Sequence, residues 1–109
     1  LFCNVVARSV PAQIVFENDH VLAFRDIRPM APTHVLVIPK KHITGVHDAQ
    51  AGDVDLLGQI VLAARDVAEQ LGLASGYRLV FNQGPDAGQS VFHVHCHVLG
   101  GRPMAWPPG

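Results

Sequence analysis

Three histidines near the C-terminal end of the chain alternate with small apolar residues in the segment H-V-H-C-H-V, residues 93–98. Successive side chains of a β-strand point to opposite faces. A strand would therefore place His93, His95 and His97 in one row and the apolar side chains on the other face. On an α-helix, alternate side chains point about 200° apart, which forms no common site. The pattern predicts a strand that presents three imidazoles to one bound group.

The residues around this row predict chemistry on a phosphate. A neutral imidazole is a good nucleophile, and a histidine can also donate a proton near neutral pH. The preceding segment contains Gly88, which lets the backbone approach a ligand closely, and Ser90, whose hydroxyl and nearby backbone N–H groups can bind phosphate oxygens. His95 has a histidine on each side and is the predicted nucleophile. His97 is the predicted donor to a phosphate oxygen, and His93 supports the row.

A functional row is favoured over two alternatives. A single histidine is more often a surface residue or a hydrogen-bonded core residue. Three histidines on one face each need a hydrogen-bond partner and repel one another when protonated, so such a cluster without a function is unfavourable. The spacing H-x-H-x-H can also bind zinc or copper, so a metal carrier is the second alternative. Activity that persists in a chelator would count against the metal carrier.

Length and composition limit the class of protein. The chain has 109 residues, of which 49% are apolar and 16% charged. These values predict one folded domain over residues 1–109 and exclude a disordered chain. The formal net charge of −1 gives no electrostatic case for nucleic acid or a membrane surface. No apolar run is long enough to span a bilayer, and two cysteines do not indicate a disulfide-stabilised secreted protein. We therefore expect a cytoplasmic protein with no nucleic-acid or membrane partner.

Hydrophobic periodicity predicts an α+β fold. Short apolar runs rich in β-branched residues predict strands at 14–17, 21–25, 34–39, 77–81 and 93–98. Asn18-Asp19 is good turn chemistry and predicts a hairpin between the first two strands. Apolar residues at helical spacing predict a long helix over 51–71, with Gly72 as its C-terminal cap, and a short helix over 2–8. The expected architecture is a five-stranded antiparallel sheet with one long helix and a short N-terminal helix.

Further segments, taken with the histidine row, resemble the histidine triad superfamily and within it the Hint branch, the histidine triad nucleotide-binding proteins. They are I-V-F-E-N-D, V-L-A-F-R-D-I, A-P-T-H-V-L-V-I-P-K-K-H-I, G-Y-R-L-V, G-Q-S-V-F, L-G-G-R and W-P-P-G. Together they cover nearly the whole chain. The resemblance therefore extends well beyond the histidine motif.

The resemblance implies a purine nucleoside phosphoramidase and nucleotide hydrolase. Such a protein binds purine nucleoside monophosphates and cleaves the P–N bond of their phosphoramidates through a nucleotidyl-histidine intermediate that water resolves. It implies a homodimer in which the sheets of two copies join, and it implies no required cofactor. The alternatives are a dinucleoside polyphosphate hydrolase or a nucleotidylyltransferase of the same superfamily, and a nucleotide-binding regulatory protein whose catalysis is vestigial.

Matched residue by residue, the resemblance makes His95 the nucleophile, with His93, His97 and His34 as further catalytic-site histidines. It implies that the α-phosphate is held by Asn82, Gly88, Ser90 and His97, with Gln89 and Val91 lining the approach. Asp26 would accept hydrogen bonds from the ribose hydroxyls, a role that suits a carboxylate. The base would lie between Phe16, Phe24 and Ile27.

A structural zinc site is the lesser hypothesis. In some histidine triad relatives an N-terminal C-x-x-C and two histidines hold zinc, and Cys3, His42 and His93 match three of these four ligands. Three ligands make an incomplete closed site. We therefore expect no metal to be required. Arg25, which stands beside Phe24 and Asp26, is expected to face away from Asp26 and to have little effect.

Overall fold

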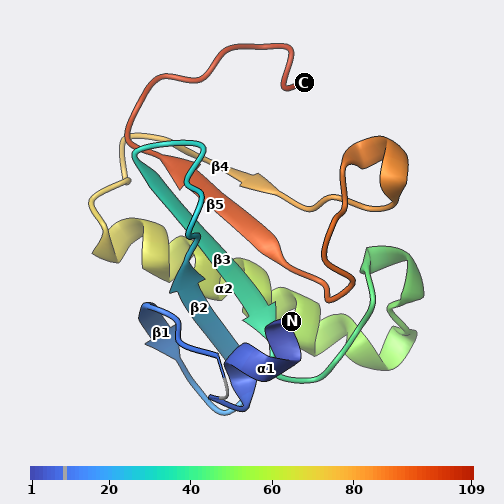
Figure 1. The fold of residues 1–109 in the computed structure, drawn as a ribbon. Coiled ribbons are helices and arrows are strands. Elements are labelled where there is room, and N and C mark those ends of the chain that lie inside the picture. The colour runs from blue at the N-terminus through green and yellow to red at the C-terminus, as the bar shows by residue number, and fades with distance from the viewer. Residues whose placement is uncertain (9) are drawn as a thin grey trace.

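The computed structural model describes residues 1–8 and 10–109, and an antiparallel five-stranded sheet dominates them (Figure 1). The helices and strands are α1 (Phe2–Val6), β1 (Ile14–Glu17), β2 (Val21–Arg25), β3 (Thr33–Pro39), α2 (Val54–Gln70), β4 (Tyr77–Val80) and β5 (Cys96–Gly100). Short 3-10 turns lie at Val46–Asp48, Ala51–Asp53 and Pro85–Ala87. The strand order is β1-β2-β3-β5-β4, which places β5 between β3 and β4. The predicted α+β architecture is confirmed.

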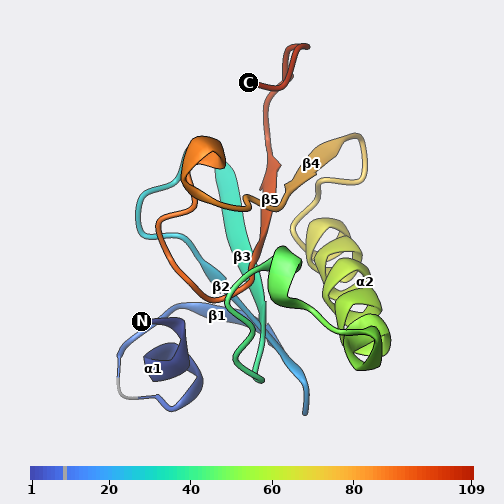
Figure 2. The same cartoon turned by 90° about the vertical axis from the view of Figure 1, so that its right-hand side faces the viewer.

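The two faces of the sheet bury different clusters, and α2 and α1 lie on opposite sides (Figure 2). On the α2 face, small and β-branched residues pack together, among them Val21, Ala23, Val35, Val37, Ala64, Val67, Cys96 and Val98. On the α1 face the buried residues are Phe2, Val5, Leu22, Phe24, Leu36 and Ile38. The alternation of strand side chains between the faces therefore builds a core beneath α2. It leaves the other face for α1 and the loop that precedes β5.

Local sequence signals explain how the elements end. The side chain of Asn18 accepts hydrogen bonds from the backbone N–H groups of His20 (2.9 Å) and Val21 (2.8 Å), which closes the predicted β1–β2 hairpin. Gly72 follows α2 with φ +78°, as a left-handed cap requires. The predicted long helix is confirmed, but α2 begins at Val54, because residues 51–53 form a 3-10 turn.

The histidine strand is shorter than the pattern predicts. It begins at Cys96, so His97 lies within β5 whereas His93 and His95 precede it. The antiparallel register pairs Val37 with Cys96, and its continuation would pair Pro39 with Val94. Proline has no N–H to extend that ladder, and the N–H of Val94 donates instead to the carbonyl of Ile43 at 2.6 Å. The prediction of one strand over 93–98 is therefore wrong at its N-terminal half.

The prediction that Cys96 is a small buried apolar residue is confirmed, since its side chain is fully buried under α2. Burial raises the pKa of its thiol to about 12, so it stays protonated at neutral pH. Among the described residues, neither helix has the length and hydropathy needed to cross a membrane.

Candidate active site

A cavity of about 430 Å³ opens on the α1 face of the sheet. It joins the histidine motif to the end of β2 and to the loop between β2 and β3. Of the residues selected from the sequence, those that line it are Phe24, Asp26, Ile27, His34, Ser90, Val91, His95 and His97. The structure thus brings together residues separated by more than 70 positions in the sequence, as the predicted site requires.

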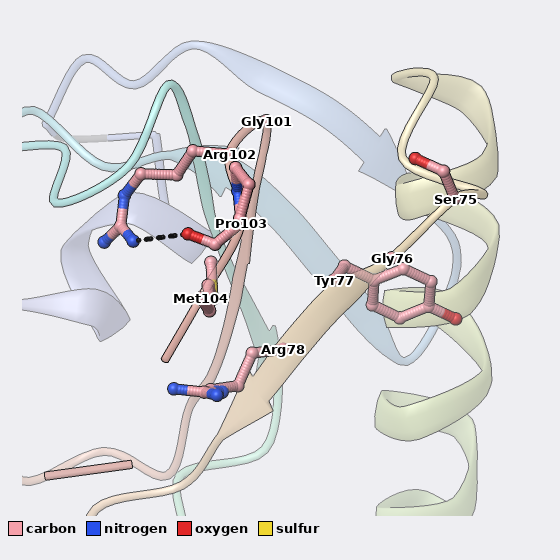
Figure 3. Close-up of a pocket in the computed structure, with 8 residues that line it drawn as sticks. All are labelled: Ser75, Gly76, Tyr77, Arg78, Gly101, Arg102, Pro103 and Met104. Atoms are coloured by element: carbon pink, nitrogen blue, oxygen red, sulfur yellow. Dashed lines mark hydrogen bonds between the residues drawn. The ribbon is translucent and has the colours of Figure 1, made fainter. Parts of the chain in front are cut away.

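A larger cavity, of about 550 Å³, lies elsewhere (Figure 3). It is formed by residues 75–78 at the start of β4 and by residues 101–104 after β5, and Arg78 and Arg102 are its charged groups. Arg78 donates to the carbonyl of Ala105 at 2.9 Å, and Arg102 donates to the carbonyls of Pro103 and Met30. Both guanidinium groups thus bind backbone. The cavity contains no histidine, carboxylate or thiol with which to carry out a reaction, so the smaller cavity is the candidate site.

The ring of His95 is held in one orientation. Its Nδ1 lies 2.7 Å from the carbonyl oxygen of His93. A carbonyl oxygen can only accept, so Nδ1 carries the proton and the lone pair of neutral His95 is on Nε2. His95 is buried, and the ring of Phe2 in α1 packs against it with the ring centroids 5.1 Å apart. His95 is therefore positioned to present a nucleophilic nitrogen.

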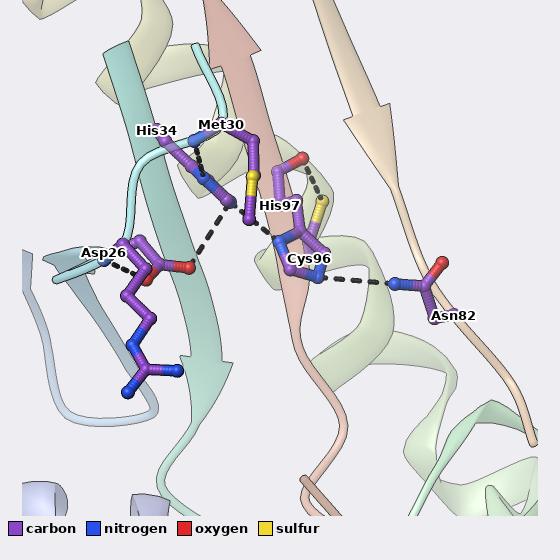
Figure 4. A network of polar contacts seen from close by, with 7 residues as sticks. Asp26, Met30, His34, Asn82, Cys96 and His97 are labelled. Carbon is purple, nitrogen blue, oxygen red and sulfur yellow. Dashed lines mark hydrogen bonds and ion pairs between the residues drawn. The ribbon is translucent and has the colours of Figure 1, made fainter. Parts of the chain in front are cut away.

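His97 lies beside His95. It belongs to a chain of polar contacts that starts at Asp26 (Figure 4). The ring centroids of His95 and His97 are 4.9 Å apart. The Nδ1 of His97 lies 2.8 Å from the Nε2 of His34, and that same Nε2 is 3.5 Å from a carboxylate oxygen of Asp26. On its other side, the Nε2 of His97 lies 3.5 Å from the side-chain amide of Asn82.

Burial keeps these two histidines neutral. Loss of solvation, together with the neighbouring His95 and His34, lowers the pKa of His97 to about 4, although the Asp26 carboxylate opposes that shift. Burial also lowers the pKa of His34, although the Asp26 carboxylate opposes that shift. At neutral pH, His34 and His97 are therefore uncharged imidazoles, each with one N–H and one lone pair.

His93 does not share the cavity with the other two histidines of the motif. Its Nε2 donates to the carbonyl of Pro39 at 2.8 Å, and its Nδ1 faces Cys3 and His42. The prediction of three imidazoles in one row is therefore wrong for its first member. The reason is the early end of the ladder at Pro39, which turns residues 91–94 away from the strand direction. His93 acts on His95 through its backbone carbonyl instead.

The loop before the motif supplies Ser90 but not Gly88 or Gln89. Gly88 has φ +81°, and its N–H donates to the carbonyl of Pro85 at 3.0 Å. The buried amide of Gln89 accepts from the N–H of Gly84 (2.9 Å) and donates to the carbonyls of Thr44 and Val91. Both residues close the loop and neither lines the cavity, so the expectations that Gly88 holds the α-phosphate and that Gln89 lines the approach stay predictions. Among the described residues, nothing pairs with the backbone N–H of Ser90.

Phe16 lies on the wrong face for the predicted base pocket. Ile14 pairs with Phe24, but Phe16 pairs with Ala23, so a bulge shifts the register between the two β1 residues. A shift of one residue moves a side chain to the opposite face. Phe16 accordingly packs against the core beneath α2, while Phe24 and Ile27 line the cavity. In this structure Phe16 therefore does not line the cavity, and its expected place in the base pocket stays a prediction.

Sequence reasoning missed several lining residues. They are Leu1, Phe2, Val5, Arg25, Arg28 and Met30. Phe2 and Val5 come from α1 and Leu1 directly precedes it, and no local pattern indicates that α1 would dock at the cavity. Arg25 is among the lining residues, but it pairs with Val35, whose side chain lies on the α2 face, so the expectation that it faces away from Asp26 and has little effect stays a prediction. The run P-M-A-P at 29–32 was a signal for a rigid loop beside His34.

A separate cluster adjoins the site and has the donor set of a metal ligand group. Cys3 Sγ, His42 Nδ1 and His93 Nδ1 lie within 4.8 Å of one another. The bond from His93 Nε2 to the Pro39 carbonyl leaves the lone pair on Nδ1, which faces the other two donors, as in many zinc sites. One sulfur and two nitrogens suit zinc, and the described residues supply no fourth donor. The cluster lies outside the cavity, so zinc held by these residues would tie α1 to the histidine segment without touching substrate.

Comparisons with known proteins agree with the residue pattern. A family model described as HIT domain matches residues 7–104. The chain is 48% identical over 111 residues to an Arabidopsis thaliana protein named adenylylsulfatase HINT1, covering all of this chain and 76% of that protein. It is also 48% identical to a 14 kDa zinc-binding protein of Zea mays, of which it covers 87%. A crystal structure of a HIT family hydrolase from Legionella pneumophila superposes with a TM-score of 0.98 at 53% identity, covering 100% of this chain and 98% of that one.

Proposed function

The chain belongs to the HIT domain family, and we propose that it is a purine nucleoside phosphoramidase that works through a nucleotidyl-histidine intermediate on His95. The observation that carries this proposal is the pair of imidazoles of the buried His95 and the partly buried His97, whose ring centroids are 4.9 Å apart in a cavity that also contains Ser90 and Asp26. The likeness to a HIT family hydrolase over the whole chain supports hydrolysis of a nucleotide.

In the first step, the Nε2 lone pair of His95 attacks the α-phosphorus. The N–P bond to His95 forms, the bond from phosphorus to the substrate nitrogen breaks, and the leaving nitrogen departs as an amine with a proton brought by the substrate or solvent. The imidazolium that forms keeps its Nδ1–H on the carbonyl of His93, which stabilises the developing charge. The nucleotidyl group now resides on His95.

In the second step, water attacks the same phosphorus from the cavity. The N–P bond breaks, the nucleoside monophosphate leaves, and His95 recovers its lone pair while a proton from the water is lost to solvent. Both steps place negative charge on the phosphoryl oxygens. The hydroxyl and unpaired N–H of Ser90, with His97, are the donors at that end of the cavity.

The other end of the cavity suits a nucleoside. Asp26 accepts from the N–H of Arg28 at 2.9 Å through one carboxylate oxygen, and its side chain stays partly exposed to accept the ribose hydroxyls. Phe24, Ile27 and Val91 provide apolar surface for a base. Asn82 lies beside His97 and would contact a phosphoryl oxygen from the opposite side.

Replacement of His95 tests the proposal. His95→Ala and His95→Asn should abolish turnover of an adenosine phosphoramidate while AMP still binds in calorimetry. Rapid quenching should trap a nucleotidyl adduct on the wild-type protein, located at His95 by mass spectrometry. Unchanged turnover in either variant would refute the nucleophile assignment, and loss of AMP binding in both would assign His95 to binding alone.

Other leaving groups would use the same residues. The Arabidopsis relative is named an adenylylsulfatase, and an adenylyl sulfate would present the same α-phosphorus to His95. Dinucleoside polyphosphates would do so as well. A panel that compares kcat/KM for an adenosine phosphoramidate, adenylyl sulfate and a diadenosine polyphosphate separates these activities. AMP binding without turnover of any of them would favour a regulatory nucleotide-binding protein.

We also propose a homodimer in the cytoplasm. β4 is an edge strand, and exposed apolar side chains lie at Tyr77 in β4 and at Trp106, with further ones at Val61 and Leu62 in α2. The two cysteines are free thiols, as expected in a reducing compartment. Sedimentation velocity over a dilution series should give the mass of two chains. A single-chain mass at micromolar concentration would contradict the dimer.

A further inference from the structure

One hydrogen bond to His34 has a direction that cannot be reversed. The backbone N–H of Met30 lies 3.0 Å from the Nδ1 of His34. A backbone N–H only donates, so Nδ1 must be the acceptor and the proton of neutral His34 must be on Nε2. That Nε2 also lies 3.5 Å from a carboxylate oxygen of Asp26, which only accepts. Two independent neighbours therefore select the same tautomer of His34.

The tautomer of His34 determines that of His97. Their facing nitrogens, Nε2 of His34 and Nδ1 of His97, are 2.8 Å apart and share one proton. Since that proton belongs to His34, the Nδ1 of His97 accepts. His97 is neutral because burial lowers its pKa to about 4. Its own proton is therefore on Nε2, at the side that faces Asn82.

Asn82 does not compete with this assignment. Its amide nitrogen lies 3.5 Å from the Nε2 of His97, but a 180° rotation of the amide brings its oxygen to the same place. With the oxygen there, Asn82 accepts from His97 in the free protein, and a phosphoryl oxygen replaces it as the acceptor when substrate binds. The opposite tautomers would put two donors face to face at Met30 and His34, and a backbone N–H cannot rotate to relieve that.

We propose that the backbone N–H of Met30 is a positioning group that, through His34, makes His97 Nε2–H a permanent hydrogen-bond donor to the phosphoryl oxygen of the substrate. The proposal rests on the proposed function and adds a role for the loop P-M-A-P at 29–32. Pro29 and Pro32 restrict the backbone of this loop. The N–H of Met30 is thus presented to His34 by a stiff segment.

The same contacts exclude proton transfer by His97. If His97 gave its Nε2 proton to the leaving group and took the proton of His34, His34 would be left with no proton on either nitrogen, because its Nδ1 is bound to the N–H of Met30. His97 therefore acts as a fixed dipole that stabilises charge, and it exchanges no proton during turnover. The proton on the leaving amine must therefore come from the substrate or from solvent.

Nuclear magnetic resonance of the ring nitrogens tests the tautomers directly, since protonated and unprotonated ring nitrogens have well-separated ¹⁵N shifts. In the wild-type protein at neutral pH, His34 and His97 should both carry their proton on Nε2, and His95 on Nδ1. This readout needs no substrate, so it stays decisive if the protein proves to hydrolyse another nucleotide. A wild-type spectrum with the Nδ1–H tautomer at His34 or His97 overturns the proposal.

A pair of variants tests the role of the N–H. Met30→Pro removes the donor, and Met30→Ala shortens the same side chain but keeps it. We expect the tautomers to stay unchanged in Met30→Ala. In Met30→Pro, His34 and His97 should populate Nδ1–H, with kcat at least about tenfold below that of Met30→Ala and KM changed less. Where Met30→Pro fails to fold, an amide-to-ester replacement of that backbone N–H serves instead. Unchanged tautomers after loss of the N–H refute the proposal.

Discussion

The carbonyl oxygen of His93 lies 2.7 Å from the Nδ1 of His95, so the first histidine of the motif holds the second through its backbone. The side chain of His93 faces the other way, toward Cys3 and His42. The contribution of His93 to catalysis is therefore separable from the chemistry of its ring. Replacement of the ring leaves the carbonyl in the chain.

His93→Ala should cost more stability than activity. The ring is almost fully buried and bonds to the Pro39 carbonyl, so its loss should lower the free energy of unfolding by about 2–4 kcal/mol. Urea titration measures this change. Below the unfolding transition, kcat should remain far above that of His95→Ala. Equal loss of kcat in the two variants would show that the His93 ring takes part in the reaction.

Asp26→Asn should weaken binding of ribonucleotides selectively. The amide keeps an oxygen for the N–H of Arg28 but loses the negative charge that attracts paired hydroxyl donors. We expect KM for an adenosine phosphoramidate to rise about tenfold or more. The matched substrate is the 2′,3′-dideoxy compound, whose KM should not change between wild type and variant. If KM rises equally for both substrates, Asp26 does not recognise the ribose hydroxyls and instead acts through His34.

The elements that local periodicity determines are those that the sequence predicts correctly. The β1–β2 hairpin depends on Asn18, and the end of α2 depends on Gly72. Both residues determine the conformation of their immediate neighbours in the sequence. The gathering of Asp26, His34, Ser90, His95 and His97 was predicted from the family resemblance, which carries tertiary information that periodicity lacks.

The errors arise where one segment decides the conformation of another. The side chain of Phe16 lies on the α2 face because a bulge shifts the pairing of β1 with β2. His93 lies outside β5 because Pro39, in β3, ends the hydrogen-bonded pairing of these two strands. Gln89 is buried by contacts with Thr44, which is 45 residues away. None of these contacts has a signal in the residues beside it. The role inferred for Met30 is also invisible in the sequence, because every residue type except proline has a backbone N–H.

Removal of metal should leave turnover intact. The cluster of Cys3, His42 and His93 lies outside the cavity, and no step proposed here needs a Lewis acid. Assays after exhaustive dialysis against a chelator should therefore retain kcat. Where the purified protein carries zinc, Cys3→Ser should lower its zinc content and its melting temperature, because α1 loses its tie to His93. Loss of turnover in chelator, restored by zinc, would contradict a structural role.

Stability should fall between about pH 6.5 and pH 4 because of His97. Its pKa is 6.5 in the unfolded chain but about 4 in the folded protein, chiefly because it is buried. The unfolded chain therefore binds the proton first as the pH decreases, and protonation favours unfolding. The contribution is complete above pH 6.5, declines through this window and is exhausted below about pH 4. A shift of this size is worth about 2–3 kcal/mol when partial exposure is considered.

His97→Gln isolates this contribution, because glutamine keeps polar atoms at the position and does not titrate. Urea titrations at a series of pH values from 7 to 4 should show a shallower decline in the variant than in the wild type, while the contribution of His34, whose pKa burial also lowers, remains in both. The difference between the two curves is the titration of His97 alone. Parallel curves would mean that the folded and unfolded chains protonate His97 over the same pH range, so that folding does not lower its pKa.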